Sequence, residues 1–241
     1  MGKLKGLLLT EGLHGMISQV EGLAKALDLD YFHEKVELNS FWKLIPPKFT
    51  PVKKFVFKNN IKKDFDLIIS CGRKSVIPSI YLKKINIKKI KNIHVQDPKV
   101  NFKNFDYIIS PEHDDLKGDN ILSSKGAIHY STSEEINEKK NYLLEKISKE
   151  KKIITLILGG PTKYYAYSNQ NLLNIFSKIS KQVLNNNFQV IVIPSNRTPF
   201  RTIDLAKKFF TKEHLIIDKV DKDAYLSSLG IAAVSYTHLR A

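Results

Sequence analysis

The sequence predicts an α/β fold organised as two units. Short apolar runs rich in β-branched residues alternate with helical patterns, which is typical of parallel sheets covered by helices. Several of these runs stop at a glycine or polar turn that a helix follows. A charged stretch with few apolar positions, residues 131–150, interrupts the alternation, which then starts again at Ile153. We therefore expect a first domain over residues 1–130, a linker helix over 131–150 and a second domain over 151–241.

The first domain opens with a strand at Gly6–Leu9 and a helix near Met16–Leu27. The turn between them contains Gly12 and Gly15, whose missing side chains let a ligand approach the backbone. His14 in the same turn is either a ligand contact or a turn residue. A second strand at Tyr31–Leu38 leads into an aromatic and proline-rich loop, Ser40–Pro51, which we expect to cover the sheet rather than to bind a ligand.

The clearest strand of this domain, Asp66–Ser70, ends at Cys71-Gly72-Arg73-Lys74-Ser75 and precedes a helix near Val76–Lys83. This order of strand, glycine and helix places backbone N–H groups near an anion at the carboxyl edge of a sheet. Arg73 and Ser75 are expected to add donors. Cys71 is interpreted as a small buried residue.

Two further strands, Asn92–Gln96 and Asp106–Ser110, end in polar turns. Glu112, His113 and Asp114 follow the second of them and are candidates for acid–base chemistry. Their adjacency argues against a metal site, because neighbouring side chains diverge. A solvated loop is the alternative. Neither a metal nor a cofactor is expected.

The second domain repeats the pattern at its first strand. Ile153–Leu158 stops at Gly159-Gly160-Pro161, and a helical pattern follows from Asn169 to Asn185. A plain tight turn without a ligand is the alternative to an anion site here, and the recurrence of the pattern favours the site. Gln189–Pro194 and Leu215–Asp218 are the next expected strands, and Asp223–Leu229 begins another helix.

Composition limits the function classes. The net charge is +15, yet only four of the 39 basic residues are arginine. A bias towards lysine, isoleucine and asparagine is typical of AT-rich coding sequence, so we expect no specific nucleic-acid partner. Scarce arginine should persist where a planar fork must hold phosphate or carboxylate, and Arg73 and Arg197 each follow an apolar strand closely.

Cellular location is constrained by three absences. The single cysteine excludes an internal disulfide, which fits a reducing cytosol. The sequence contains no secretory signal and no apolar run that could span a bilayer. We expect a cytoplasmic protein without a transmembrane segment, and contact with a membrane surface stays open.

The last stretch, Ala233–Ala241, departs from the lysine–isoleucine–asparagine composition of the rest. It suggests no closing element for the second sheet. We interpret it as a non-native tail on a truncated second domain.

Taken in order, the strand-end motifs resemble the elongated-mitochondria fission protein family. The resemblance runs from about Leu7 to Ala232 and is carried by the early glycine loop and by five later motifs: Cys71-Gly72-Arg73-Lys74-Ser75, Gln96-Asp97-Pro98, Pro111-Glu112-His113-Asp114, Leu158-Gly159-Gly160-Pro161-Thr162 and Ser195-Asn196-Arg197-Thr198-Pro199. It implies a fold like that of a GT-B glycosyltransferase, with two Rossmann-like domains facing each other across a cleft, the second incomplete here. The composition suggests a bacterial member.

The resemblance also implies that these strand-end loops line the cleft, with Gln96, Asp97, Thr162, Ser195 and Thr198 among the ligand-binding residues. One reading is then a metal-independent glycosyltransferase that binds a nucleotide sugar or another phosphorylated small molecule. Arg73, Arg197 and Lys163 would neutralise a diphosphate, the backbone after Gly159 and Gly160 would add donors, and Glu112, His113 or His14 would be the base. The alternative reading is a non-catalytic interaction protein related to mitochondrial fission factors.

Overall fold

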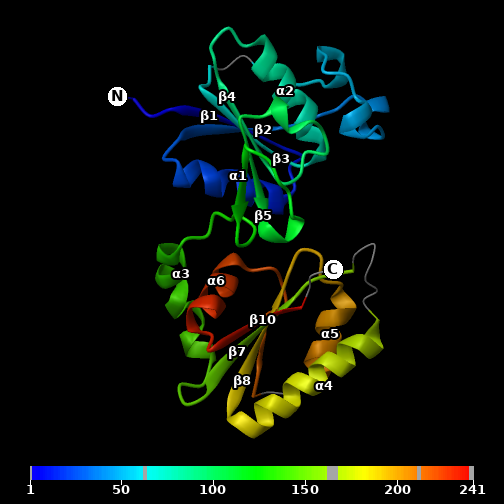
Figure 1. Cartoon of the computed structure of the whole chain (residues 1–241). Coiled ribbons are helices and arrows are strands. Elements are labelled where there is room, and N and C mark those ends of the chain that lie inside the picture. The colour runs from blue at the N-terminus through cyan, green and yellow to red at the C-terminus, as the bar shows by residue number, and fades with distance from the viewer. Residues whose placement is uncertain (1, 62–63, 162–167, 211–212, 239–241) are drawn as a thin grey trace. The chain divides into compact units, whose positions relative to one another are not determined.

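The computed structural model describes residues 2–61, 64–161, 168–210 and 213–238. It divides the chain into two compact units, Met1–Tyr130 and Ser131–Ala241. Each unit is built on its own parallel sheet with helices on the sheet faces (Figure 1). The predicted α/β class is confirmed.

The first unit contains a six-stranded sheet in the order β2-β1-β3-β4-β5-β6, all parallel. Because β2 lies on one side of β1 and all later strands lie on the other, the direction in which strands are added reverses between β1 and β3. Open α/β sheets bind ligands at such a reversal, outside the carboxyl ends of the strands. The strands are β1 Lys5–Thr10, β2 Asp30–Lys35, β3 Leu67–Cys71, β4 Lys91–Val95, β5 Tyr107–Pro111 and β6 Ile121–Ser124.

Two α-helices cover opposite faces of this sheet, α1 (His14–Ala26) and α2 (Val76–Ile85). The alternation of side chains along β1 shows why both faces must be covered. Leu7 and Leu9 lie in the core beneath α2, and Leu8 lies in the core beneath α1. Short 3₁₀ helices form the connections: η1 Phe41–Lys43, η2 Pro47–Phe49, η3 Lys54–Val56, η4 Arg73–Ser75, η5 Phe102–Asn104 and η6 Glu112–Asp114.

The second unit contains a four-stranded parallel sheet in the order β10-β7-β8-β9. Its reversal lies between β7 and β10. Phe176 is fully buried between the sheet and the helices of one face, and Leu143 is fully buried on the other face. The elements are α3 Ser133–Lys139, η7 Lys140–Lys146, β7 Lys152–Leu158, α4 Asn169–Asn186, β8 Phe188–Pro194, α5 Phe200–Phe209, β9 Leu215–Ile216, α6 Lys222–Ile231 and β10 Val234–His238.

Residues 131–150 form α3 and η7 instead of a single linking helix. These two helices pack on α6 within the second unit. The main-chain N–H of Leu143 donates to Ser227 Oγ over 3.1 Å, and that hydroxyl donates to the Lys140 carbonyl over 2.9 Å. The segment has few apolar side chains to bury, and these polar contacts with α6 help to hold it in place.

The expectation that Ala233–Ala241 adds no strand was wrong. Val234–His238 forms β10, which pairs in parallel with Ile154–Leu158 of β7. Its sequence alternates apolar and polar residues, so it lacks the continuous apolar run by which the other strands of this sheet were predicted. None of the described helices combines the length and the apolar character needed to cross a membrane.

Candidate functional site

The carboxyl ends of β1 and β3 flank the strand reversal of the first unit, and the turn after β3 has a fixed shape. Gly72 has φ +93°, and a Cβ there would lie 2.6 Å from Met16 Sδ, so only glycine fits without strain. Ser75 is fully buried, and its hydroxyl donates to the Gly72 carbonyl over 2.8 Å. This hydrogen bond therefore joins the two ends of the turn.

A carboxylate of the protein occupies the donors at the start of this turn. Glu11, from the loop after β1, accepts from the main-chain N–H of Lys74 over 3.0 Å and pairs with Lys74 Nζ at 2.8 Å. The Glu11 side chain is 13% exposed. The Lys74 main-chain N–H is one of the backbone donors that the sequence suggested for an external anion, and here the Glu11 carboxylate accepts from it.

Arg73 and Gly12 are also engaged within the unit. The Arg73 guanidinium donates to the carbonyl of Lys43 in η1. Gly12 has φ +83°, and its N–H donates to Thr10 Oγ1 over 3.0 Å. A Cβ on Gly15 would meet nothing within 4 Å, so this glycine leaves open space at the start of α1.

His14 is exposed at the beginning of α1 and contacts Tyr130. The two rings stack with their centroids 5.9 Å apart, and His14 Nε2 lies 3.4 Å from the Tyr130 hydroxyl. The contact joins the start of α1 to the end of the first unit.

The turn after β4 is held by side-chain contacts. Gln96 has φ +82°, and its amide Nε2 donates to Gln19 Oε1 over 3.2 Å. Asp97 accepts from the main-chain N–H of Lys99 over 2.8 Å and pairs with Lys99 Nζ at 2.5 Å. Gln19 Oε1 also accepts from Cys71 Sγ over 3.7 Å. The Gln19 side chain therefore contacts residues at the carboxyl ends of both β3 and β4.

Glu112 and His113 lie exposed in η6, after β5. The acidic residue with defined contacts is their neighbour, Asp114. It accepts from the Ser110 hydroxyl over 3.0 Å, and its other oxygen lies 3.6 Å from His113 Nε2. Sequence reasoning grouped the three residues together, and only the structure distinguishes them.

In the second unit, the loops after β7 and β8 are packed against each other. A Cβ on Gly160 would lie 1.9 Å from the Arg197 carbonyl oxygen. The Leu158 carbonyl accepts from the Thr198 hydroxyl over 2.6 Å and from the main-chain N–H of Ser195 over 3.1 Å. The Thr198 hydroxyl also accepts from that N–H over 2.8 Å. Gly160, Ser195 and Thr198 therefore fix the turn that carries Arg197.

The Arg197 side chain is exposed on this fixed turn, and its guanidinium makes no hydrogen bond or ion pair with any residue that the structure describes. The helix α5 starts three residues later, with Pro199 as its N-cap and no side chain capping it. A helix start without a cap presents free N–H groups to an anion. Gly159 is buried at the end of β7, whereas Thr162 and Lys163 lie outside the described residues.

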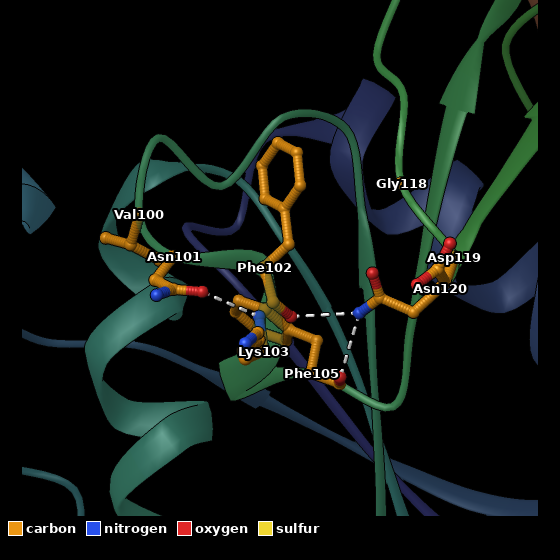
Figure 2. Close-up of a pocket in the computed structure, with 8 residues that line it drawn as sticks. All are labelled: Val100, Asn101, Phe102, Lys103, Phe105, Gly118, Asp119 and Asn120. Atoms are coloured by element: carbon orange, nitrogen blue, oxygen red, sulfur yellow. Dashed lines mark hydrogen bonds between the residues drawn. The ribbon is translucent and has the colours of Figure 1, made fainter.

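One hollow of the first unit lies at the opposite edge of the sheet. It is an open pocket of about 700 Å³ before β5 and β6 (Figure 2). The Asn120 amide in its lining bonds to other lining residues, since it donates to the carbonyls of Phe102 and Phe105 over 2.9 and 3.0 Å. It lies at the amino ends of the strands and is not part of the predicted site.

Sequence reasoning missed two residues of the first unit, Glu11 and Gln19. Glu11 follows β1 directly, so its place at a strand end was a usable signal. Its partner Lys74 is 63 positions away, and nothing in the sequence pairs them. Gln19 lies on α1 among apolar positions, and its contacts with Cys71 and Gln96 carry no local pattern.

Solved structures that share this fold include a UDP-GlcNAc 2-epimerase and the protein MnaA. UDP-GlcNAc 2-epimerase from Methanocaldococcus jannaschii aligns with a TM-score of 0.55 and 12% identity, over 97% of this chain and 78% of that one. S. aureus MnaA, in a co-structure with UDP, aligns with a TM-score of 0.54 and 12% identity, over 97% of this chain and 74% of that one. The likeness shows a GT-B-like fold of two Rossmann-like units.

Sequence comparisons define the family. A protein of Rickettsia prowazekii (strain Madrid E), uncharacterized protein RP120, is 26% identical over 166 residues, which are 56% of this chain. The match spans 46% of the Rickettsia protein, so it covers less than half of that relative. The family model described as mitochondrial fission ELM1 matches residues 14–237, which reaches into the stretch interpreted as a non-native tail. The chain therefore belongs to the mitochondrial fission ELM1 family.

Proposed function

We propose that the second unit binds the diphosphate of a nucleotide sugar at the carboxyl edge of β7 and β8, and that the protein acts as a glycosyltransferase of the GT-B type. The observation that carries the proposal is the exposed guanidinium of Arg197. It extends from a turn that Thr198 and Gly160 fix to the end of β7, next to the uncapped start of α5. A guanidinium and free helix N–H groups together suit a phosphate.

The choice of ligand is supported by the solved structures of the same fold, which are a UDP-GlcNAc 2-epimerase and a protein with bound UDP. UDP and UDP-GlcNAc are therefore the first compounds to test, with GDP, ADP and inorganic phosphate as comparisons. The second unit is favoured for the phosphates because Glu11 already places a negative charge at the corresponding turn of the first unit.

Isothermal titration calorimetry of the wild-type chain with UDP and UDP-GlcNAc tests the proposal. Arg197→Lys keeps the positive charge but loses the planar guanidinium that can donate two parallel hydrogen bonds. The affinity for UDP should therefore fall about tenfold, which is ~1.4 kcal/mol. Arg73→Lys is the matched control, because the Arg73 guanidinium is bonded to Lys43. No binding of any nucleotide, or equal affinity for wild type and Arg197→Lys, would refute the phosphate site.

A base for an acceptor hydroxyl would come from the first unit, where Glu112, His113 and His14 remain candidates. Sugar-nucleotide hydrolysis or transfer should fall in Glu112→Gln, His113→Asn or His14→Asn while UDP affinity stays unchanged. Nucleotide binding without turnover of any sugar donor would favour the non-catalytic alternative. The expectation that both sheet edges share one cleft stays a prediction.

A further inference from the structure

The connection between β2 and β3 contains a stretch of unusual composition, residues 38–61, called here the basic aromatic segment. It has no aspartate or glutamate. Its charged side chains are five exposed lysines: Lys43, Lys48, Lys53, Lys54 and Lys58. In the first unit of Figure 1 the segment is the light-blue portion beside α2.

One side of the segment belongs to the core. Val56 and Phe57 are buried against α2, and Trp42 and Val52 are partly buried in the same cluster. The other side is exposed and strongly apolar. Its four largest side chains are each more than half exposed: Phe41 66%, Leu44 82%, Phe49 71% and Phe55 58%.

The exposed side is held in place by the fold. Leu38 and Phe57 form an antiparallel bridge across the ends of the segment. The Arg73 guanidinium donates to the Lys43 carbonyl of η1. The Trp42 ring lies 4.9 Å from Phe41 and 5.9 Å from Phe55, centroid to centroid. The segment therefore presents a preformed apolar surface.

Within the described parts of the chain, the lysines of the segment lack acidic partners. No carboxylate of a described residue forms a salt bridge with any of the five, although Lys54 contacts the Phe57 ring at 4.4 Å. Lysines interspersed with exposed aromatic and aliphatic side chains are typical of proteins that lie at an anionic membrane surface, where apolar side chains enter the headgroup region and lysines contact lipid phosphates.

We propose that the basic aromatic segment docks the protein on a membrane surface rich in anionic lipids, with Leu44 and Phe49 inserted at the interface. Charge complementarity favours this occupant. A second copy of the chain would bring the same lysines face to face in a symmetric contact. A nucleic acid could contact these lysines through its phosphates, but its bases are bound by arginine and polar side chains. The segment offers no arginine, and Leu44 points outward between its lysines.

The chain supplies its own probe, because Trp42 is the only tryptophan and lies in the segment. The full 241-residue protein is titrated with two kinds of vesicle. One is pure phosphatidylcholine, and in the other ~40 mol% of the lipid is the anionic phosphatidylglycerol. Binding is measured by cosedimentation. Trp42 emission should shift to shorter wavelength only with the anionic vesicles, and brominated lipid should quench it.

Two variants separate the apolar and the ionic parts of the interaction. Leu44→Ser/Phe49→Ser should weaken partitioning into anionic vesicles at least about tenfold, because two exposed side chains no longer enter the interface. Lys48→Gln/Lys53→Gln should weaken it roughly 25-fold, at about fivefold for each lysine near the surface. All four side chains are exposed, so the unfolding midpoint should stay at the wild-type value.

Matched controls carry the same kinds of change elsewhere in the first unit. Leu27→Ser replaces a side chain that is 47% exposed at the end of α1, and Lys103→Gln/Lys125→Gln removes two other exposed lysines. Both controls should bind vesicles within about twofold of wild type, apart from the weaker general effect of net charge.

Five results would overturn the proposal. The first is no binding to anionic vesicles, and the second is an equal loss of binding in the segment variants and the controls. The third is vesicle binding that Leu44→Ser/Phe49→Ser leaves unchanged, which indicates attraction by net charge alone. The fourth is a wild-type dimer in sedimentation that this variant dissociates. The fifth is preferential binding to a short duplex DNA, weakened by the same variants, which would identify a nucleic acid as the occupant.

Discussion

Gly160→Ala tests the packing on which the proposed phosphate site depends. The added Cβ would lie 1.9 Å from the Arg197 carbonyl oxygen, 2.6 Å from its carbonyl carbon and 2.8 Å from its Cβ. Carbon–oxygen contacts in proteins begin near ~3.3 Å, so the two loops must separate by about 1.4 Å. The nearest obstacle is main chain, which cannot turn aside as a flexible side chain does.

The cost has two parts. Overpacking a tight site destabilises proteins by about 1–3 kcal/mol. The same displacement strains the hydrogen bonds that the Leu158 carbonyl accepts from Ser195 and Thr198, each of which contributes about 0.5–1.5 kcal/mol. We expect a loss of about 2–4 kcal/mol in the free energy of unfolding of the second unit, and weaker nucleotide binding because Arg197 moves.

Urea unfolding can assign this loss to one unit. Trp42 lies in the first unit and is the only tryptophan, so its fluorescence follows that unit, whereas far-ultraviolet circular dichroism follows both. With a urea dependence of about 2 kcal/mol per molar, Gly160→Ala should lower the midpoint of the second unit by roughly 1–2 M. Gly15→Ala is the control, since its Cβ meets nothing within 4 Å and alanine favours the helix. An unchanged midpoint in Gly160→Ala would refute the reasoning.

Three further predictions concern polar groups inside the units. Glu11→Gln should lower the stability of the first unit by about 1.5–3 kcal/mol, followed by Trp42 fluorescence in urea, because a charged acceptor for Lys74 is lost; wild-type stability would contradict it. Burial lowers the pKa of His94 to about 3, so the unfolded chain binds the extra proton. The contribution of His94 to stability should then be constant above pH 6.5 and fall by ~1.4 kcal/mol per pH unit towards pH 3. His94→Gln should therefore reduce the difference between the urea midpoints at pH 5 and pH 7.5. Part of that difference should remain, because burial also lowers the pKa values of His33 and His214. The buried Thr202 hydroxyl has no hydrogen-bond partner among the described residues, so Thr202→Val should raise the melting temperature with a gain of about 1–2 kcal/mol; a loss would indicate an unrecognised partner.

The sequence predicted the buried strands well because each is a continuous apolar run. β3 and β7 show this, since all of Leu67–Cys71 is buried and so is most of Lys152–Leu158. β10 was missed for the opposite reason, because Val234–His238 alternates in polarity. The short 3₁₀ helices η1 to η3 in the connection after β2 were also beyond prediction, since three-residue helices leave no periodic pattern.

The candidate site was less predictable, because tertiary contacts decide which donors are free. In the sequence, the scarcity of arginine made Arg73 and Arg197 equally good candidates for binding an anion. In the structure the first donates to Lys43, and the second makes no hydrogen bond or ion pair with the described residues. Likewise, Gly72 and Gly160 both follow a strand in the sequence, and only coordinates reveal that one is required by its φ of +93° and the other by the Arg197 carbonyl.

The two units thus share a local backbone arrangement but differ in the charged groups beside it. Both place a glycine turn after a buried strand and before a helix. In the first unit the turn is closed by Glu11, whose carboxylate takes the main-chain N–H that a phosphate would need. In the second unit no carboxylate of a described residue pairs with Arg197, and α5 starts without a side-chain cap. If Glu11→Ala created a sulfate site in the first unit while Arg197→Lys left phosphate affinity unchanged in the second, the assignment of the phosphates would have to be reversed.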